Sequence, residues 1–417
     1  MKIRINGNKK LFLSGKNLME IATYLFYFLV LFSLEGNNGE DLPGLNSSYV
    51  FFGIYLLIGI LCLLRKKKIM IEKKVEDFFP VVILLVWFYG VILGFLKGNP
   101  TAYIIRNFAG MVVYIVYYIM INCKWDLKVI AKIITTLSYI TVYITILTYI
   151  DYYVLGLRIL PQGRHIIPSS YAVLFSMRQL IYVSYAICLY RILVEKKKSI
   201  FWIIHIISTW YAVVVCEKAD GDLLALFVIT IMIVTSIPFV LSQSKRKKQV
   251  ANIFLILGTV LGIFIFLVFI PNNFIANIFS ENAGGNSIRY LQIEYVFKHF
   301  DFWGHGLGAI FSSELGPKYS GGYAIEVIYL NLFHKFGIFG VILIMIYVVT
   351  FYETIKIVRH NQISYYNAVP LACAGYMISS IGNPMLLAVG SILLHCYILC
   401  CVRFYKLNEK KNACISS

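Results

Sequence analysis

Long apolar runs separated by short polar segments recur along the whole chain. Each run is long enough for a helix to cross the roughly 30 Å hydrocarbon core, where a helix satisfies its own backbone hydrogen bonds. The pattern predicts an all-α, polytopic helical membrane protein with about twelve transmembrane helices. The predicted spans are 18–34, 47–64, 78–96, 101–121, 129–150, 171–190, 200–216, 222–241, 250–270, 337–355, 366–382 and 386–402.

Composition agrees with this pattern. Hydrophobic residues make up 59% of the chain and charged residues 14%, whereas a globular domain carries about 25% charged residues. The first apolar run ends in EGNNGE without a small-residue cleavage site, so we expect it to remain as a membrane helix. The nine Cys residues form no disulfide framework, because most lie in or beside spans, where a thiol packs as a small apolar group.

The basic residues predict the orientation. With twelve spans both termini share a side, and 28 of the 38 Lys and Arg residues lie in the loops and tails of that side. The positive-inside rule therefore places both termini in the cytoplasm. The net charge of +18 is then a topology signal that favours the anionic inner leaflet, and nucleic acid is not a predicted partner.

Ten basic residues fall on the side that the rule depletes or inside spans, so some of them need another explanation. Arg106 and Arg178 lie within predicted spans four and six, where a charge costs about 2.5 kcal/mol or more. Such residues usually face a cavity and mark function, although a long Arg near the surface can also reach the interface. For Arg178 we favour function, and for Arg106 the two interpretations stay open. The ten are Lys97, Arg106, Arg158, Arg164, Arg178, Lys218, Arg289, Lys298, Lys318 and Lys335.

Two polar segments, 151–170 and 271–323, form the longest predicted outer loops, the second between spans nine and ten. Both are too short for a separate core and too rich in Tyr, Phe and Ile for free linkers. We therefore predict one integral membrane domain over 1–417, with these loops covering an active-site cavity from outside.

The longer loop predicts one helix, from Ser287 to about Phe300. Glu294 and Lys298 form an i,i+4 pair on its polar side, while Arg289 lies on the opposite side, above Ile293, Val296 and Phe300. The GHGLG turn that follows could cradle an anion with successive amides of Gly306 and Gly308, although such a turn alone is weak support. An Arg fork fits phosphate oxygens in a bidentate manner, so Arg289 is a candidate anion ligand.

Titratable candidates lie at two further places. Glu326, Leu330, Phe333 and Gly337 recur at helical spacing before span ten, and a half-buried Glu326 suits a general base because burial raises its pKa. His334 is the second candidate, although a His beside a Lys at an interface is more often solvated.

The corner between spans seven and eight, CEKADGD, holds three acids and Lys218. It reads either as a solvated, helix-capped hairpin tip or as a place where Lys218 meets an anionic substrate.

Together these segments resemble the bacterial polysaccharide polymerase and O-antigen ligase superfamily. GRHIIPSSYAVLF is similar to a family stretch with an Arg and a following Pro, which maps to Arg164. CEKADGDLLAL resembles the family corner with its basic residue at Lys218. The loop helix with a leading Arg, closed by Gly-x-Gly, maps to Arg289, Gly306 and Gly308. Where ligases place a His eleven residues before a Gly, this chain has Glu326 before Gly337, a difference that the resemblance associates with polymerases.

The resemblance implies a GT-C-like glycosyltransferase in the bacterial cytoplasmic membrane, with its active site facing outward. Its activity would be metal-independent, cofactor-free, inverting polymerisation of undecaprenyl-diphosphate-linked oligosaccharide repeat units, which serve as donor and acceptor. Arg289, Arg164 and Arg178 would hold the diphosphate, Lys218 would assist, and Glu326 would accept the proton. Membrane lipid is an expected partner, and a chain-length regulator protein is one that the resemblance allows.

Three alternatives stay open. An O-antigen-type ligase would use the same chemistry on another acceptor, against which Glu326 in place of His argues. A lipid-linked oligosaccharide flippase would also need basic cavity residues, but such carriers are commonly built from internal repeats, and the two halves of this chain show none. A non-catalytic scaffold would leave Arg178 and Arg289 without a use.

Overall fold

A computed structural model gives the fold of the chain. It describes residues 2–3, 11–12, 15–32, 47–64, 75–123, 126–160, 166–167, 172–173, 178–218, 220–241, 249–250, 253, 286–311, 327–360, 364–381 and 384–416. These residues are mostly helical, as predicted. The strands among them are two antiparallel pairs of two residues each, β1 (Lys2–Ile3) with β2 (Leu11–Phe12) and β3 (Ile166–Ile167) with β4 (Ala172–Val173).

Seven helical stretches among the described residues are long and apolar enough to cross a membrane, which makes the chain a polytopic helical membrane protein. Two shorter apolar stretches lie in α1 (Gly15–Phe32) and α2 (Ser47–Leu64). The seven are Val75–Leu96, Thr101–Asn122, Leu127–Val154, Ile200–Glu217, Gly221–Leu241, Ile338–Val358 and Val389–Asn408.

Several of these spans are not uniform α-helices. The second continues from α4 (Thr101–Ala109) through the 3-10 turn η1 (Gly110–Tyr114) into α5 (Ile115–Cys123). Two other spans end in a π-helical turn. One is α6 (Leu127–Tyr149) followed by η2 (Ile150–Val154), and the other is α8 (Ile200–Tyr211) followed by η6 (Ala212–Glu217). The remaining spans are α3 (Val75–Leu96), α9 (Asp220–Leu241), α14 (Ile338–Val358) and α17 (Val389–Ser416). Such π-helical turns are frequent at functional sites.

Two predicted spans differ from the structure. Span 171–190 is not one continuous helix, because 172–173 form β4, and its described helical part is the 3-10 turn η5 (Arg178–Leu180) followed by α7 (Ile181–Leu193). Span 366–382 is broken into η7 (Tyr365–Asn367), α15 (Ala368–Cys373) and α16 (Gly375–Ser379), followed by η8 (Pro384–Leu387). Apolar composition alone does not separate such broken segments from a continuous span. Span 250–270 lies outside the described residues apart from 250 and 253, so the total of twelve stays a prediction.

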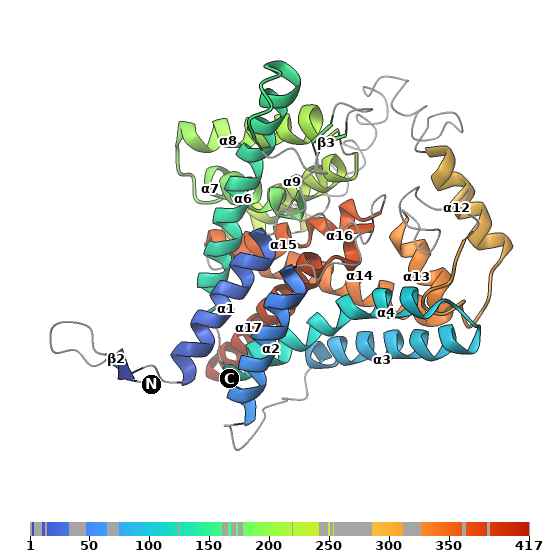
Figure 1. Cartoon of the computed structure of the whole chain (residues 1–417). Coiled ribbons are helices and arrows are strands. Elements are labelled where there is room, and N and C mark those ends of the chain that lie inside the picture. Colours follow the sequence, from blue (N-terminus) through green and yellow to red (C-terminus); the bar gives the residue numbers. More distant parts are fainter. Residues whose placement is uncertain are drawn as a thin grey trace.

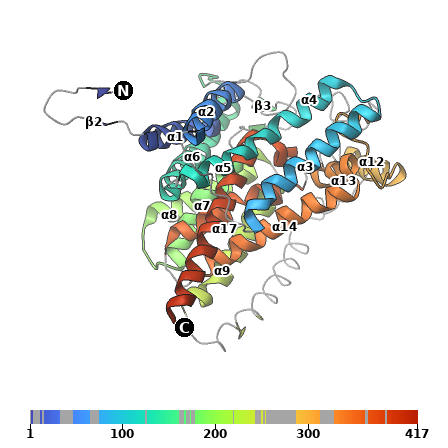
Figure 2. The same cartoon turned by 90° about the horizontal axis from the view of Figure 1, so that it is seen from below.

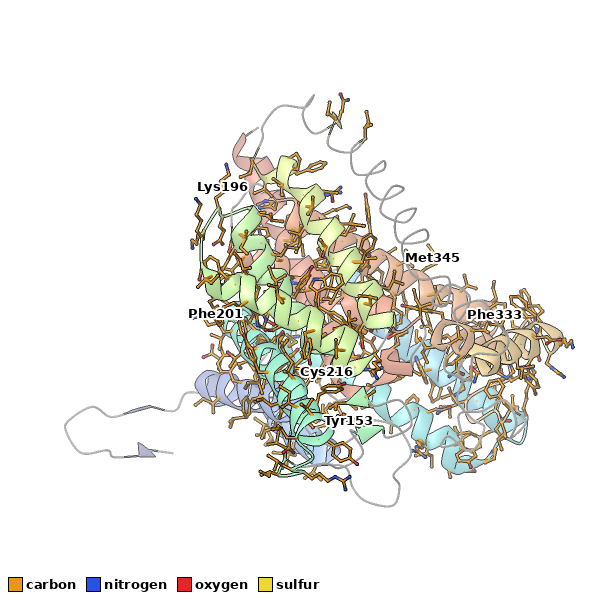
Figure 3. The ribbon with its side chains drawn as sticks, turned by 90° about the horizontal axis from the view of Figure 1, so that it is seen from above. Tyr153, Lys196, Phe201, Cys216, Phe333 and Met345 are labelled. Carbon is orange, nitrogen blue, oxygen red and sulfur yellow. The ribbon has the colours of Figure 1, made fainter. Side chains whose placement is uncertain are left out.

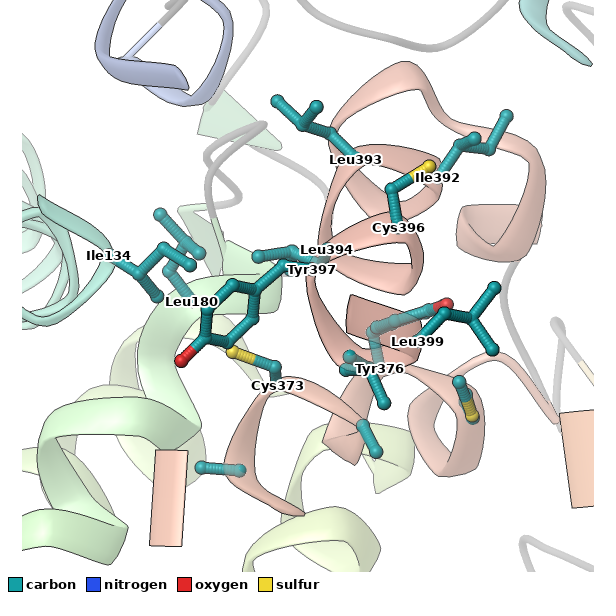
Figure 4. Close-up of a cluster of buried hydrophobic side chains, with 14 of the residues drawn as sticks. Ile134, Leu180, Cys373, Tyr376, Ile392, Leu393, Leu394, Cys396, Tyr397 and Leu399 are labelled. Carbon is teal, nitrogen blue, oxygen red and sulfur yellow. The ribbon is translucent and has the colours of Figure 1, made fainter. Parts of the chain in front are cut away.

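The central helix of the bundle is α17 (Figure 1). Its apolar window is 72% buried, against 50% or less in the other six spans. Figure 4 shows Tyr397 of α17 facing Cys373 of α15, with Leu180 beside them. Because α17 contacts η1, α5, α14 and α15, it joins the early and late thirds of the chain into one hydrophobic core.

One end of the bundle, which we call the basic end, gathers the charged ends of α3, α14 and α17. Arg403 Nε lies 3.0 Å from Asp77 Oδ1, and the Tyr117 hydroxyl donates to the same oxygen at 2.6 Å. Lys406 pairs with Glu76 and lies 3.5 Å from Glu353. Both acids of the first turn of α3 are buried, so these cations offset a cost that would otherwise be several kcal/mol.

Among the described residues, two of the segments predicted to be cytoplasmic, around 195 and 365, contact each other. The Tyr365 amide donates to Glu195 at 3.1 Å, and the Arg191 guanidinium lies 4.2 Å from the Tyr365 ring centroid. Arg359 stacks on Phe239 near the end of α9. The alternation of loops between two ends, inferred from charge, therefore agrees with the packing of α7, α9 and α14. We call the opposite end the loop end.

We expect Arg403→Met to destabilise the fold by about 3–5 kcal/mol, because it leaves the buried Asp77 carboxylate without its cation. The measurement is the thermal unfolding midpoint of the detergent-solubilised protein by fluorescence-detected size exclusion. The control is Lys298→Gln, which removes an exposed i,i+4 pair and should cost less than about 0.5 kcal/mol. Equal midpoints for the two variants would contradict the proposed contribution of the Arg403–Asp77 pair to stability.

Candidate functional site

The segment 301–308 is fixed at the loop end by backbone hydrogen bonds. The amides of His305, Gly306 and Leu307 donate to the carbonyls of His334, Lys335 and Gly90, at 2.9, 2.9 and 2.8 Å. Asn99 Nδ2 also donates to the carbonyls of His305 and Leu307, both at 2.9 Å. The segment is thereby held between α3 and α13 (Ile328–Phe336).

The glycines of this segment serve close packing. Gly306 has a φ of +78°, and a Cβ there would lie 2.3 Å from the backbone nitrogen of Gly94. Gly308 has a φ of +74°, and its Cβ would lie 2.9 Å from the backbone nitrogen of Ile104. Their amides donate to Lys335 O and to Asn107 Oδ1, the latter at 3.2 Å. The predicted anion cradle is therefore wrong for these two glycines, because both N–H groups are already engaged within the protein.

Asn107 and Lys335 connect α4 to α13. Lys335, a residue that is 1% exposed, donates from Nζ to Asn107 Oδ1 at 2.6 Å, and burial lowers the pKa of its amine to about 7. The preceding residue of α4, Arg106, is half-buried in the last turn of that helix. The sequence singled out Arg106 and counted Lys335 among the outer basic residues, but it gave no signal for Asn107.

His334 is buried in a stack of aromatic rings, contrary to the expectation that it is solvated. Its ring centroid lies 4.2 Å from that of His305 and 4.5 Å from that of Phe311, and its Nδ1 has no hydrogen-bond partner. Burial, and then the charges of His305 and Lys335, lower the pKa of His334 to about 3. A ring with so little affinity for protons is a poor general base near neutral pH.

A second ionisable group, the carboxylate–arginine cluster (Arg178, Tyr182, Glu217 and Asp222), lies where α7, η6 and α9 meet. Asp222 is fully buried, accepts a hydrogen bond from the Tyr182 hydroxyl and lies 3.9 Å from Arg178 Nε. Arg178 stands in the 3-10 turn before α7 rather than inside a span, because the helix starts later than predicted. The Asp222 carboxylate partly offsets the charge of Arg178 at this distance.

Glu217 and Lys218 form the corner itself. Glu217, the last residue of η6, is 1% exposed, and neither of its carboxylate oxygens has a hydrogen-bond partner. Lys218 is exposed and adopts the left-handed conformation, with a φ of +51°, which is uncommon outside glycine. The interpretation of a solvated, capped tip is thus wrong for Glu217 and Asp222, which are both buried. The sequence gave no sign of this burial. Gly221, the residue before Asp222, packs against the backbone of Ser379 in α16.

The predicted loop helix is α12 (Asn286–Lys298). The Glu294–Lys298 pair on it is confirmed, with Oε1 and Nζ 2.5 Å apart. Its buried side passes through Gln292 and Val296, whereas Ile293 is exposed, so the predicted apolar face is partly wrong. Arg289 is a residue of α12, and the direction of its side chain stays a prediction.

Two candidates, Arg164 and Glu326, lie outside the described residues. Glu326 precedes α13, which begins at Ile328 and is separated from α14 by Gly337. The continuous helical spacing predicted from Glu326 to Gly337 is therefore wrong at its end, because Gly337 breaks the helix with a φ of +55°.

The loop end thus presents two separate polar groups. Figure 3 shows Phe333 of α13 well away from Cys216, the neighbour of Glu217. They are linked through α16, since the Tyr329 hydroxyl of α13 donates to the Met377 carbonyl and α16 packs against α9. No protein-family model matches the chain, and no curated protein is significantly similar to it.

We expect Gly306→Ala to destabilise the protein by about 3 kcal/mol or more, because the new methyl group collides with backbone as well as straining φ. The matched control is Gly98→Ala. Gly98 has a φ of +72° but nothing within 4 Å of an added Cβ, so it should cost only about 1 kcal/mol. Equal losses in thermal unfolding midpoint would show that the close approach to α3 is unimportant.

We expect acid to destabilise the protein partly through His334. Its pKa is about 3 when folded and 6.5 ordinarily, so the unfolded chain binds more protons as pH falls from about 6.5 towards 3. The free energy of unfolding should then fall by up to about 1.4 kcal/mol per pH unit. His334→Gln should flatten this part of the unfolding midpoint against pH. Parallel curves for the two proteins would contradict the assignment.

Proposed function

We propose that this protein polymerises lipid-diphosphate-linked oligosaccharide repeat units at the loop end, which faces out of the bacterial cytoplasmic membrane. The observation that carries the proposal is the burial of the Arg178 cation, and of the amine of Lys335, at the end that the positive-inside rule depletes. Buried cations near a membrane surface usually mark the path or site of a charged substrate.

The chemistry fits an anionic leaving group. In glycosyl transfer from a lipid diphosphate, the anomeric C–O bond breaks and negative charge grows on the diphosphate, while an acceptor hydroxyl attacks and loses its proton. Fixed guanidinium groups stabilise that charge without reorganising. We assign this role to Arg289, Arg164 and Arg178, the last of which lies beside Asp222. The exposed Lys218 at the corner would assist them.

The proton is assigned to Glu326. Among the described residues His334 is a weaker acceptor, because its pKa of about 3 keeps its affinity for protons low. A ligase acting on another acceptor would use the same groups, so the two activities differ only in the acceptor. The absence of the ligase-type His at Glu326 favours the polymerase.

We expect the purified protein in lipid nanodiscs to convert undecaprenyl-diphosphate-linked repeat units from its host into a ladder spaced by one unit. Products are separated by gel and identified by mass spectrometry, with chelator present throughout. Transfer only onto another supplied acceptor would indicate a ligase. Unchanged substrate that crosses the bilayer would indicate a transporter and contradict the proposal.

The residue assignments are tested in the same assay. Because bidentate binding needs a guanidinium, Arg289→Lys should lower the rate by roughly 10-fold or more, and Glu326→Gln by about 100-fold. Lys298→Gln, on the same helix but exposed, is the matched control and should keep full activity. A fully active Arg289→Lys would show that charge alone suffices, and a fully active Glu326→Gln would remove the assigned base.

A further inference from the structure

Aromatic side chains at the end of α12 and in the turn after it are exposed although they lie beside membrane-spanning helices. Phe297 is 65% exposed and Trp303 is 56% exposed, and both Phe300 and Phe302 are 52% exposed. We call these four residues the aromatic patch. Exposed apolar groups gathered in this way mark an interaction surface.

The patch continues a stripe along α12. Ile293 and Phe297 stand at i and i+4 on one side of α12, and Phe300 follows two residues after the helix ends at Lys298. This side lies between the buried side of Gln292 and Val296 and the charged side of Glu294 and Lys298. A helix with such a third side, apolar but not covered by protein, is typical of one that lies in a membrane interface.

The turn is held level with membrane-spanning helices. The Tyr89 hydroxyl of α3 donates to the Trp303 carbonyl at 2.7 Å, and the Ile338 amide of α14 donates to the Phe302 carbonyl at 3.0 Å. Tyr89 lies seven residues before the end of α3 at Leu96, which is about 10 Å along a helix axis. Trp303 is thus placed beside the span rather than beyond it.

The outward surfaces of α3 and α14 beside the turn are apolar. Phe88 and Phe95 of α3 are exposed, as are Ile338 and Val341 of α14, and the two helices run side by side (Figure 2). Trp303 packs against Phe339 with ring centroids 6.3 Å apart, so the patch is continuous with this surface. In a polytopic membrane protein such a surface contacts lipid.

We propose that the aromatic patch is a lipid anchor that inserts into the bilayer interface at the loop end and contacts phospholipid acyl chains. The amphipathic indole of Trp303 is favoured at that depth, and Phe side chains insert there from the apolar face of interfacial helices. The Glu294–Lys298 pair then faces water, and Phe300, stacked on Phe333 of α13, joins the anchor to the bundle. The anchor fixes the height of α12 above the membrane helices, and with it the backbone position of Arg289. It does not depend on which reaction the protein carries out.

The test is fluorescence quenching of the whole protein in nanodiscs made with brominated phosphatidylcholine. The chain has five Trp residues, so the signal of Trp303 is the difference between the unchanged protein and Trp303→Phe. We expect this difference signal to be quenched about twofold more by bromine near the headgroup end of the acyl chain than by bromine near the methyl end, because interfacial groups insert only about 5–10 Å. Trp87→Phe is the control, because Trp87 is buried and its difference signal should respond little to either lipid.

Iodide in the aqueous phase gives the opposing measurement. Strong quenching of the Trp303 signal by iodide and none by bromine would place the patch in water and overturn the proposal. Protection from both quenchers, together with a dimeric mass, would overturn it in favour of a second copy of the chain covering the patch.

Discussion

Backbone hydrogen bonds between the segment 302–307, α3 and the corner between α13 and α14 hold the loop end together. Gly306 lies directly against the backbone of Gly94, so the segment packs closely on α3. Four backbone hydrogen bonds join the segment to the bundle, and α12 ends shortly before the segment begins. The positions of α12 and of the aromatic patch therefore depend on a turn that only small residues can form.

Burial of charge is the second constraint, and the two ends of the bundle meet it differently. At the basic end each buried acid of α3 has a cation from α17, so the network joins helices distant in sequence. At the loop end one Arg faces a buried Asp, and a neighbouring Glu has no hydrogen-bond partner. Asp77 Oδ2 and Glu353 Oε2 at the basic end also lack a hydrogen-bond partner, so the two ends differ in how many cations face their buried acids rather than in complete satisfaction.

The irregular helices lie close to this second group. The π-helical turn η6 ends at Glu217, Lys218 follows in a left-handed conformation, and the predicted span six starts late, at Arg178. Helical irregularity within membrane depth is tolerated where it is buried in protein or lines a cavity. These features coincide with the residues that the sequence singled out by charge alone, which supports a functional role for this corner.

The sequence by itself determined the class of protein and the position of most of the described spans. These features follow from local composition, since a long apolar helix has few alternatives in a membrane. The Glu294–Lys298 pair was equally predictable, because it depends only on spacing within one helix. Tertiary structure decided which charged groups are buried: Asp222 is enclosed by Tyr182 and Arg178, and His334 by His305 and Phe311, all distant in sequence. It also gave Gly306 and Gly308 a packing role in place of anion binding, because the partners of their amides lie on α13 and α4.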